Sequence, residues 1–167
     1  MKRITLAVAA AVLAIGAIGA PVVAGSSGGS SIVGTAIAVN QQSGEFDHLV
    51  AAVQRAGLVG ELSRNRQLTV FAPTDAAFER LFATLGVSGV NDIPVGTLRS
   101  VLLHHVAPGS RYSGDVLDST RIRTLNGDFV RPHVVGGVPY IDNARIVAAD
   151  VPASNGVIHV IDAVLLP

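Results

Sequence analysis

The spacing of apolar positions changes along the chain near residue 112. Before that point apolar side chains recur at every third or fourth residue, which is typical of helices packed on one side. After it they alternate with polar residues or form short runs, which is typical of strands. The order of helices first and strands last predicts an α+β fold rather than a repeating βαβ one. We expect helices at residues 32–39, 43–57, 59–64, 75–85 and 94–105, and strands at residues 69–72, 121–125, 129–135, 138–141, 146–151 and 157–165.

The junction between the first predicted strand and the following helix is the clearest local signal. Phe71 ends a run that suits a half-buried strand, and Pro73 stops that strand because proline has no N–H to give to a neighbouring strand. Thr74 then has the side chain of an N-cap, and Asp75 places negative charge at the positive end of the helix dipole. The core face of this helix is predicted to consist of Phe78, Leu81, Phe82 and Leu85.

Three glycine-containing pairs predict where the strands reverse direction. Asn126-Gly127 between two strand-like runs is a strong hairpin signal, and Gly136-Gly137 offers a second reversal. Asn155-Gly156 supplies the turn that leads into the last strand. That strand is apolar on both faces, so we expect it to be central in the sheet.

The N-terminal region predicts export. A short cationic start precedes an uncharged apolar run at residues 4–20, so residues 1–24 are predicted to be a signal peptide cut after Ala24. The alternative is an uncleaved anchor. Residues 25–31 contain only glycine and serine and are predicted to be a flexible linker. Residues 32–167 have the size of one domain, and we expect the mature chain to have no transmembrane span and to be secreted, extracellular or held at the cell envelope, in the periplasm or at the cell surface.

Charge and cysteine content exclude several classes of protein. The chain has 12 basic and 12 acidic residues, and removal of Lys2 and Arg3 with the signal leaves 12 − 2 = 10 basic residues. No basic cluster is present, so a nucleic-acid partner is not expected. The absence of cysteine excludes disulfides, thiol catalysis and thiolate metal sites.

The histidines show no arrangement that indicates an enzyme. Adjacent histidines such as His104 and His105 point about 100° apart on a helix, so they do not easily share a metal ion. There is no His-Glu-x-x-His motif, no Gly-x-Ser-x-Gly elbow and no phosphate-binding glycine loop. We therefore expect no catalysis, no cofactor and no metal. The full set of histidines is His48, His104, His105, His133 and His159.

Three segments resemble the signatures of the fasciclin domain, an extracellular module. Residues 69–81 are similar to its first signature, and residues 102–109 (Leu-Leu-His-His-Val-Ala-Pro-Gly) are similar to its central element, with His104 where the family usually has tyrosine. Residues 155–167 are similar to its closing motif. The resemblance implies a wedge-shaped β-sheet body with several helices around it. It also implies an adhesion or interaction module that binds a cell-surface or matrix protein, or a glycan.

The resemblance also indicates which residues to follow in the structure. The candidate partner-binding residues are Leu102, Leu103, His104, His105 and Val106, and loss of the tyrosine argues against the integrin binding of animal members. The expected structural residues are Phe71, Thr74, Asp75, His105 and His159. We expect the His105 ring to be satisfied by nearby polar groups in the core, and we hypothesise that Asp75 pairs with it.

Three alternatives remain beside this interpretation. The arginines at 121, 123 and 131 could form a cluster for acidic polysaccharide or carboxylates, although a solvated sheet edge whose charges prevent aggregation is the favoured explanation. The domain could instead be a carrier or accessory subunit that holds a small apolar ligand between helices and sheet. An enzyme that uses His104 or His105 is the third alternative.

Overall fold

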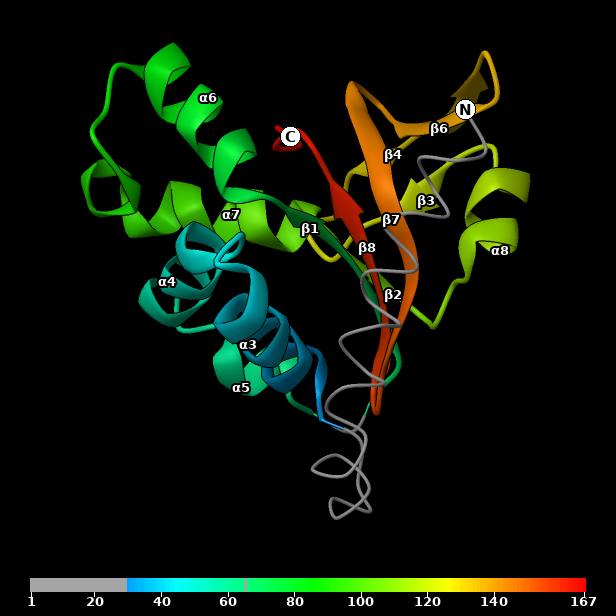
Figure 1. Cartoon of the computed structure of the whole chain (residues 1–167), viewed down its shortest axis with the longest axis horizontal. Coiled ribbons are helices and arrows are strands. Elements are labelled where there is room, and N and C mark those ends of the chain that lie inside the picture. Colours follow the sequence, from blue (N-terminus) through cyan, green and yellow to red (C-terminus); the bar gives the residue numbers. More distant parts are fainter. Residues whose placement is uncertain (1–29, 65) are drawn as a thin grey trace.

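The structure is a computed structural model that describes residues 30–64 and 66–167. Helices α3 to α7 gather on one side of the long central strands, and α8 with the short strands lies on the other (Figure 1). The predicted signal peptide lies outside the described residues, as does most of the predicted linker. The last two linker residues, Ser30 and Ser31, are described: Ser30 O accepts from Ser154 N at 3.0 Å, and Ser31 Oγ accepts from Gly34 N at 3.3 Å.

The helices follow the spacing of the apolar positions, with two short additions, of which one is the 3₁₀ helix η1. All five predicted helices are present, but the chain also forms a short helix after Tyr112, where strands were expected. The start of this helix is capped by a residue of the helix itself, because the Asp115 side chain accepts a hydrogen bond from the backbone N–H of Tyr112 at 3.2 Å. The helices are α3 (Ile32–Ser43), α4 (Asp47–Arg55), α5 (Val59–Leu62), α6 (Asp75–Leu85), the 3₁₀ helix η1 (Val90–Asp92), α7 (Val95–His104) and α8 (Ser113–Asp118).

The strands form one six-stranded sheet in the order β2-β1-β8-β7-β6-β5 and a separate two-stranded hairpin of β3 and β4. β1 and β8 are parallel neighbours, while every other pairing in the described residues is antiparallel. The strands are β1 (Leu68–Pro73), β2 (Val106–Pro108), β3 (Ile122–Arg123), β4 (Phe129–Val130), β5 (Pro132–Val135), β6 (Val138–Ile141), β7 (Ala144–Ala153) and β8 (Gly156–Ile161). The α+β order and the three glycine turns are confirmed.

Both faces of the central strands are covered. One apolar cluster lies between the sheet and the helices and contains Leu49, Phe78 and Leu98. The second lies on the opposite face and contains Phe71, Ile122 and Ile141. As a result every residue of β1 and of β8 is buried. The central position predicted for the last strand is confirmed. The prediction that the first strand is half-buried was wrong, because the layer formed by α8 and the β3–β4 hairpin covers its second face.

Two details of the predicted strand-to-helix junction were also wrong. Thr74 is at the N-cap position of α6, but its hydroxyl makes no capping hydrogen bond. Its carbonyl accepts instead from Ala77 N and Phe78 N. Leu85, expected in the core, is 50% exposed because it lies in the last turn of α6, beyond the edge of the helix layer.

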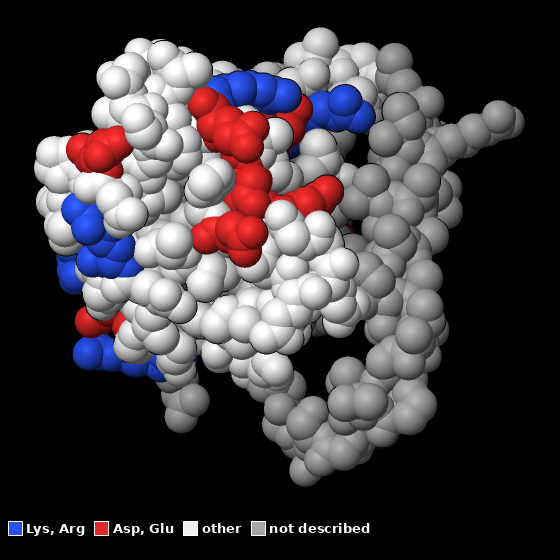
Figure 2. Space-filling view, turned by 60° about the vertical axis from the view of Figure 1, so that its left-hand side comes forward, with Lys and Arg blue, Asp and Glu red and all other residues white. Residues whose placement is uncertain are grey.

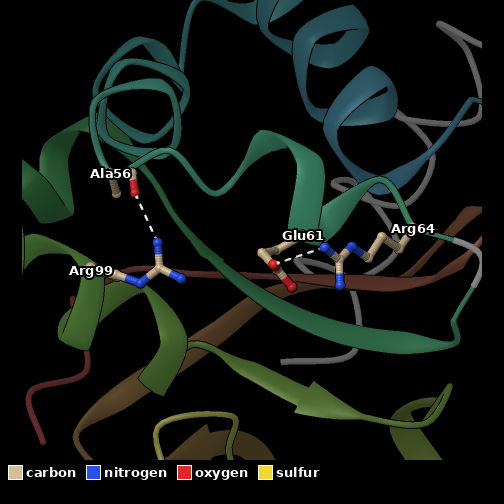
Figure 3. Close-up of polar contacts among 4 residues, drawn as sticks. All are labelled: Ala56, Glu61, Arg64 and Arg99. Atoms are coloured by element: carbon tan, nitrogen blue, oxygen red, sulfur yellow. Dashed lines mark hydrogen bonds and ion pairs between the residues drawn. The ribbon is translucent and has the colours of Figure 1, made fainter.

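Two polar contacts of arginine side chains lie near the C-terminal ends of α4 and α5. Arg99 of α7 donates from Nη1 to the carbonyl oxygen of Ala56 at 3.4 Å, just after α4 ends (Figure 3). Arg64, two residues after the end of α5, has its Nη2 3.3 Å from Oε1 of Glu61 in that helix, an exposed pair that contributes little to stability (Figure 3). The hydrogen bond from Arg99 to Ala56 links the end of α4 to α7.

Acidic side chains gather where α4 and α6 meet. Asp75 N donates to Glu45 O at 2.8 Å, and Asp47 N donates to Asp75 Oδ2 at 3.1 Å, so three acidic residues lie close together. Figure 2 shows a continuous band of acidic side chains on the helix side of the molecule, with basic groups toward its margins. The surface where α4 and α6 begin therefore disfavours acidic partners.

Candidate functional site

The segment predicted to bind a partner runs from the end of α7 into β2. Leu102, His104, His105 and Val106 are all buried, each no more than 3% exposed, and Leu103 is half-buried. The fold holds them there because α7 turns directly into β2, which pairs with β1. Binding by these five residues stays a prediction, but in this packing a partner has direct access to little more than Leu103 and one edge of His104.

His105 is held by a hydrogen bond at each ring nitrogen. Its Nδ1 lies 2.7 Å from the carbonyl oxygen of Val101, and Leu165 N donates to Nε2 at 2.8 Å. Since Nε2 accepts, Nδ1 carries the proton and the ring is neutral. Burial lowers the pKa of His105 to about 4, because the charged form is poorly solvated there. This matches the satisfied core imidazole expected from the sequence.

Asp75 does not pair with His105, so that hypothesis was wrong. The two oxygens of its carboxylate accept from Asp47 N at 3.1 Å and His48 N at 2.8 Å. These are the first two N–H groups of α4, whose own N-cap residue, Phe46, offers no side-chain hydrogen bond. Asp75 therefore caps a neighbouring helix, and both nitrogens of His105 are engaged elsewhere.

The three signature segments meet along β1 (Leu68–Pro73) and β8 (Gly156–Ile161), a pair of strands that we call the β1–β8 seam. Phe71 lies opposite His159 in the register, and their rings stack with centroids 5.7 Å apart. Phe71 N donates to His105 O at 2.8 Å, which joins the central segment to the other two. The seam is thus a single structural unit.

His159 is also satisfied on both sides. Asp150 N donates to its Nδ1 at 3.3 Å, and Nε2 lies 2.8 Å from the carbonyl oxygen of Arg111, to which it donates. Burial is the main cause of its lowered pKa. Asp150 sits at an irregularity of β7 with φ of 61°, and its carboxylate accepts from both Ser113 N and Ser113 Oγ at 2.6 Å. The structural role expected for His159 fits these contacts.

His104 differs from the other two buried histidines because it faces an open cup. Its Nδ1 lies 3.4 Å from Thr124 Oγ1, and burial lowers its pKa against the opposing pull of Asp128 and Asp142. The cup has a volume of about 500 Å³. We call it the His104 cup, and its lining residues are His104, Arg121, Asp128, Phe129, Arg131, Asp142, Leu166 and Pro167.

The His104 cup joins two candidate surfaces that were separate in the sequence. Arg121 lies over the ring of Phe129, 4.5 Å from its centroid, and Arg131 lines the same cup. Arg123 is not among the lining residues. Asp142 accepts from Arg131 N at 3.1 Å through Oδ1. Sequence reasoning missed Asp128 and Phe129, whose only signal was their position beside the predicted Asn126-Gly127 turn, and it also missed Asp142, which lies beside no predicted turn.

A second cavity lies where the carrier alternative expected one, between the helices and the sheet. It is lined by apolar residues of α3, α4, α5, β1 and β8. Among the described residues, no three His, Cys, Asp or Glu side chains are grouped to hold a metal ion. No helix in that part of the chain combines the length and apolar composition needed to cross a bilayer.

Residues 44–167 match the model of the fasciclin domain family. The chain belongs to this family. Protein sll1483 of Synechocystis is 42% identical over 122 residues, which cover 73% of this chain and 67% of that protein. The transforming growth factor-beta-induced protein ig-h3 of Sus scrofa is 34% identical over 135 residues, 81% of this chain, and this chain spans only 20% of ig-h3.

Among solved structures, the fasciclin domain pair of the insect cell adhesion molecule fasciclin I has the same fold. The TM-score is 0.67 at 18% identity, and the match covers 83% of this chain and 51% of that one. At this identity the likeness concerns the fold alone. It confirms the α+β fasciclin fold, and the fasciclin domain family is generally non-catalytic and is associated with adhesion and cell-surface proteins.

Proposed function

We propose that this fasciclin domain is an exported interaction module that binds a cell-surface or matrix partner, protein or glycan, through the His104 cup. The observation that carries the proposal is the meeting of His104 from the central segment with Arg121 and Arg131 from the hairpin region. The cup is the place where the predicted partner-binding segment reaches an opening.

The cup is lined by two arginines and two aspartates, so its formal charge is balanced, and its two guanidinium groups are the donors that can bind carboxylates or other acidic groups of a partner. Among the described residues, neither Arg121 nor Arg131 forms an ion pair within 4.0 Å, so their guanidinium groups keep their donors for a partner. A guanidinium group binds a carboxylate through two parallel hydrogen bonds. Phe129, which is 44% exposed, adds an apolar surface beside Arg121. The acidic band on the helix side directs such a partner toward the cup.

The relatives support the class of function but not the partner. The solved neighbour is described as a cell adhesion molecule, and the match to this chain covers about half of that chain. The signal-like N-terminus supports export, so the partner is expected in the cell envelope or outside the cell. An interaction role needs no cofactor, which agrees with the absence of recognisable catalytic motifs in the sequence.

Binding to an acidic polysaccharide, polygalacturonate, tests this proposal by biolayer interferometry with the purified chain. The double variant Arg121→Ser with Arg131→Ser is expected to bind at least about tenfold more weakly, a loss of about 1.4 kcal/mol or more. Arg123→Ser is the matched control, because Arg123 is exposed in the same hairpin but outside the cup. Binding should also weaken as salt is raised.

The same three proteins are then incubated with envelope extract from the native host. Recovery of the same partner by wild type and by Arg123→Ser, with loss in the double variant, supports the cup as the contact surface. Equal recovery by all three proteins contradicts it.

A further inference from the structure

The second cavity and a smaller neighbouring space form an apolar groove along α3. Two adjoining spaces of about 80 Å³ and about 30 Å³ share Ala36 of α3, Ala72 of β1 and Ile158 of β8. Ala36 and Ala72 are small, so together with Ile158 they form only a thin wall between the two spaces. The groove extends from Val59 of α5 at one end to Phe46 before α4 at the other. We call it the α3 groove.

The chemistry of the walls excludes a polar occupant. Every residue that lines the α3 groove is apolar except Gln54. A polar group inside such a groove would lose its hydrogen bonds to water without replacement. Gln54 is exposed on α4, so it offers an amide at the opening and not in the interior. The arrangement fits an apolar tail with one polar end.

Helix α3, which covers the groove, is hydrogen-bonded to the other walls at its two ends and not in its middle. At the start of α3, Ile32 N donates to Asn155 Oδ1 at 2.7 Å. At the other end, Asn40 accepts from Phe46 N and donates to Asp47 Oδ1, both at 2.7 Å. Among the described residues, no hydrogen bond links residues 33–39 to the other walls. These middle residues are only partly buried or exposed, so the contact of α3 with the groove is made by side-chain packing between two hydrogen-bonded ends.

The dimensions of the groove exclude a peptide helix as occupant. A helix with its side chains is about 10–12 Å across, far wider than these spaces allow. The groove is instead long and narrow, since residues 32–39 of α3 alone cover about 10 Å of its length at about 1.5 Å per residue. A single unbranched hydrocarbon chain has the shape that such a groove accepts.

We propose that the α3 groove binds the unbranched acyl chain of a fatty acid or lipid, with the polar end of the molecule at Gln54. This site is separate from the His104 cup and does not depend on the function proposed for the cup. The domain would thus hold an apolar ligand on its helix side, whatever it contacts through the cup.

The proposal is tested by displacement of cis-parinaric acid, whose fluorescence rises on burial and which no tryptophan of this chain obscures. Octanoate, decanoate and laurate are the competitors. Each methylene that enters an apolar site is expected to tighten binding about fourfold until the groove is filled. Ala36→Leu, which adds bulk where the two spaces meet, should weaken all three competitors at least about tenfold. Ala38→Leu is the matched control, since Ala38 is exposed on the same helix and lines neither space.

Several outcomes overturn the proposal. These are no displacement by any competitor, no dependence on chain length, equal binding by Ala36→Leu and Ala38→Leu, or tighter binding of the branched chain of farnesol than of laurate. If Ala36→Leu fails to fold, Val59→Phe narrows the groove from α5 and should give the same loss. The Arg121→Ser, Arg131→Ser double variant must bind laurate as wild type does, so failure at the cup and failure at the groove are distinguishable.

Discussion

The β1–β8 seam and the α3 groove share residues of the same two strands but are built in opposite ways. In the seam, His159 has a partner at both ring nitrogens and the Phe71 ring stacks on its ring, and His105, whose carbonyl accepts from Phe71 N, is likewise satisfied at both ring nitrogens. In the groove, apolar side chains of α3 face β1 and β8 across space that they do not fill. The comparison shows that hydrogen bonds and ring contacts are concentrated where the signature segments meet, and that unfilled space is found under the helix cover.

Asn155 connects the two regions. Its side chain accepts from Ile32 N at the start of α3 and donates to the carbonyl oxygens of Leu62 and Arg64 at 2.7 and 3.2 Å. Its own carbonyl accepts from Leu68 N at the start of β1. A residue of the closing signature therefore sets where the groove cover begins.

The largest expected effect comes from adding a single methyl group to the seam. A Cβ at Gly156 would lie 1.9 Å from the carbonyl oxygen of Leu68, and the backbone there has φ of 156°. Since Leu68 belongs to the paired strand β1, neither chain can move aside cheaply. Gly156→Ala should lower the free energy of unfolding by more than about 4 kcal/mol, or prevent folding.

Chemical denaturation followed by circular dichroism measures this loss. Gly96→Ala is the control, because a Cβ at Gly96 in α7 meets nothing within 4 Å and alanine favours the helix by up to about 1 kcal/mol. A Gly156→Ala protein as stable as wild type would show that the seam is no tighter than the groove.

The second effect is a pH dependence that arises in the seam and not in the groove. The pKa of His105 is about 4 in the folded protein and about 6.5 when the chain unfolds, so protons bind the unfolded state first as the pH falls. Stability from this group is complete above pH 6.5 and declines by about 3 kcal/mol as the pH falls from 6.5 to 4. His104 and His159, whose pKa values are also lowered by burial, act in the same direction.

Urea denaturation at a series of pH values measures this decline, and the NMR signals of the His105 ring report its titration directly. A His105 ring that titrates at pH 6.5 or above in the folded protein contradicts the assignment. No histidine lines the α3 groove, so acyl-chain binding by the folded protein should not follow the same titration.

The third effect tests the residue that links the two regions. Asn155→Ala leaves Ile32 N and two carbonyl oxygens without their partner, which should cost about 1–3 kcal/mol. Amide hydrogen exchange should speed up at residues 32–36 in particular, because the start of α3 loses its anchor. Asn91→Ala is the control, since Asn91 is exposed. Faster exchange spread evenly over the domain would instead indicate a general loss of stability.

The sequence predicted the parts of this fold that depend on neighbouring residues. Helix spacing, the stop at Pro73 and the glycine turns follow from local preferences, and the motifs identified the family. The parallel pairing of β1 with β8 is not readable in this way, because it joins residues nearly 90 positions apart, such as Val70 and Ile158. The short helix α8 was missed because its six residues carry no helical apolar stripe.

The candidate site was only partly predictable for the same reason. The His104 cup takes residues from the end of α7, from the hairpin region and from the turn at Asp142. Sequence analysis singled out His104 and the arginines, but it could not show that they share one opening. It also could not show that Val106 would be enclosed by the sheet and its two cover layers.

The smallest effect concerns Asp75, whose partner the sequence assigned wrongly. Removal of its carboxylate leaves Asp47 N and His48 N at the start of α4 without an acceptor, so Asp75→Ala should cost about 1 kcal/mol, as loss of an N-cap does. Asp118→Ala is the contrast: Asp118 is exposed in the last turn of α8, where its charge opposes the helix dipole, so its loss should be neutral or slightly stabilising.

Thermal denaturation with amide exchange at residues 47 and 48 measures the Asp75 effect. Since α4 forms a wall of the α3 groove, its cap also helps to hold that wall in place. Asp75→Ala should therefore loosen the start of α4 and leave the pH profile set by His105 unchanged. A changed profile would mean that Asp75 acts on the seam after all.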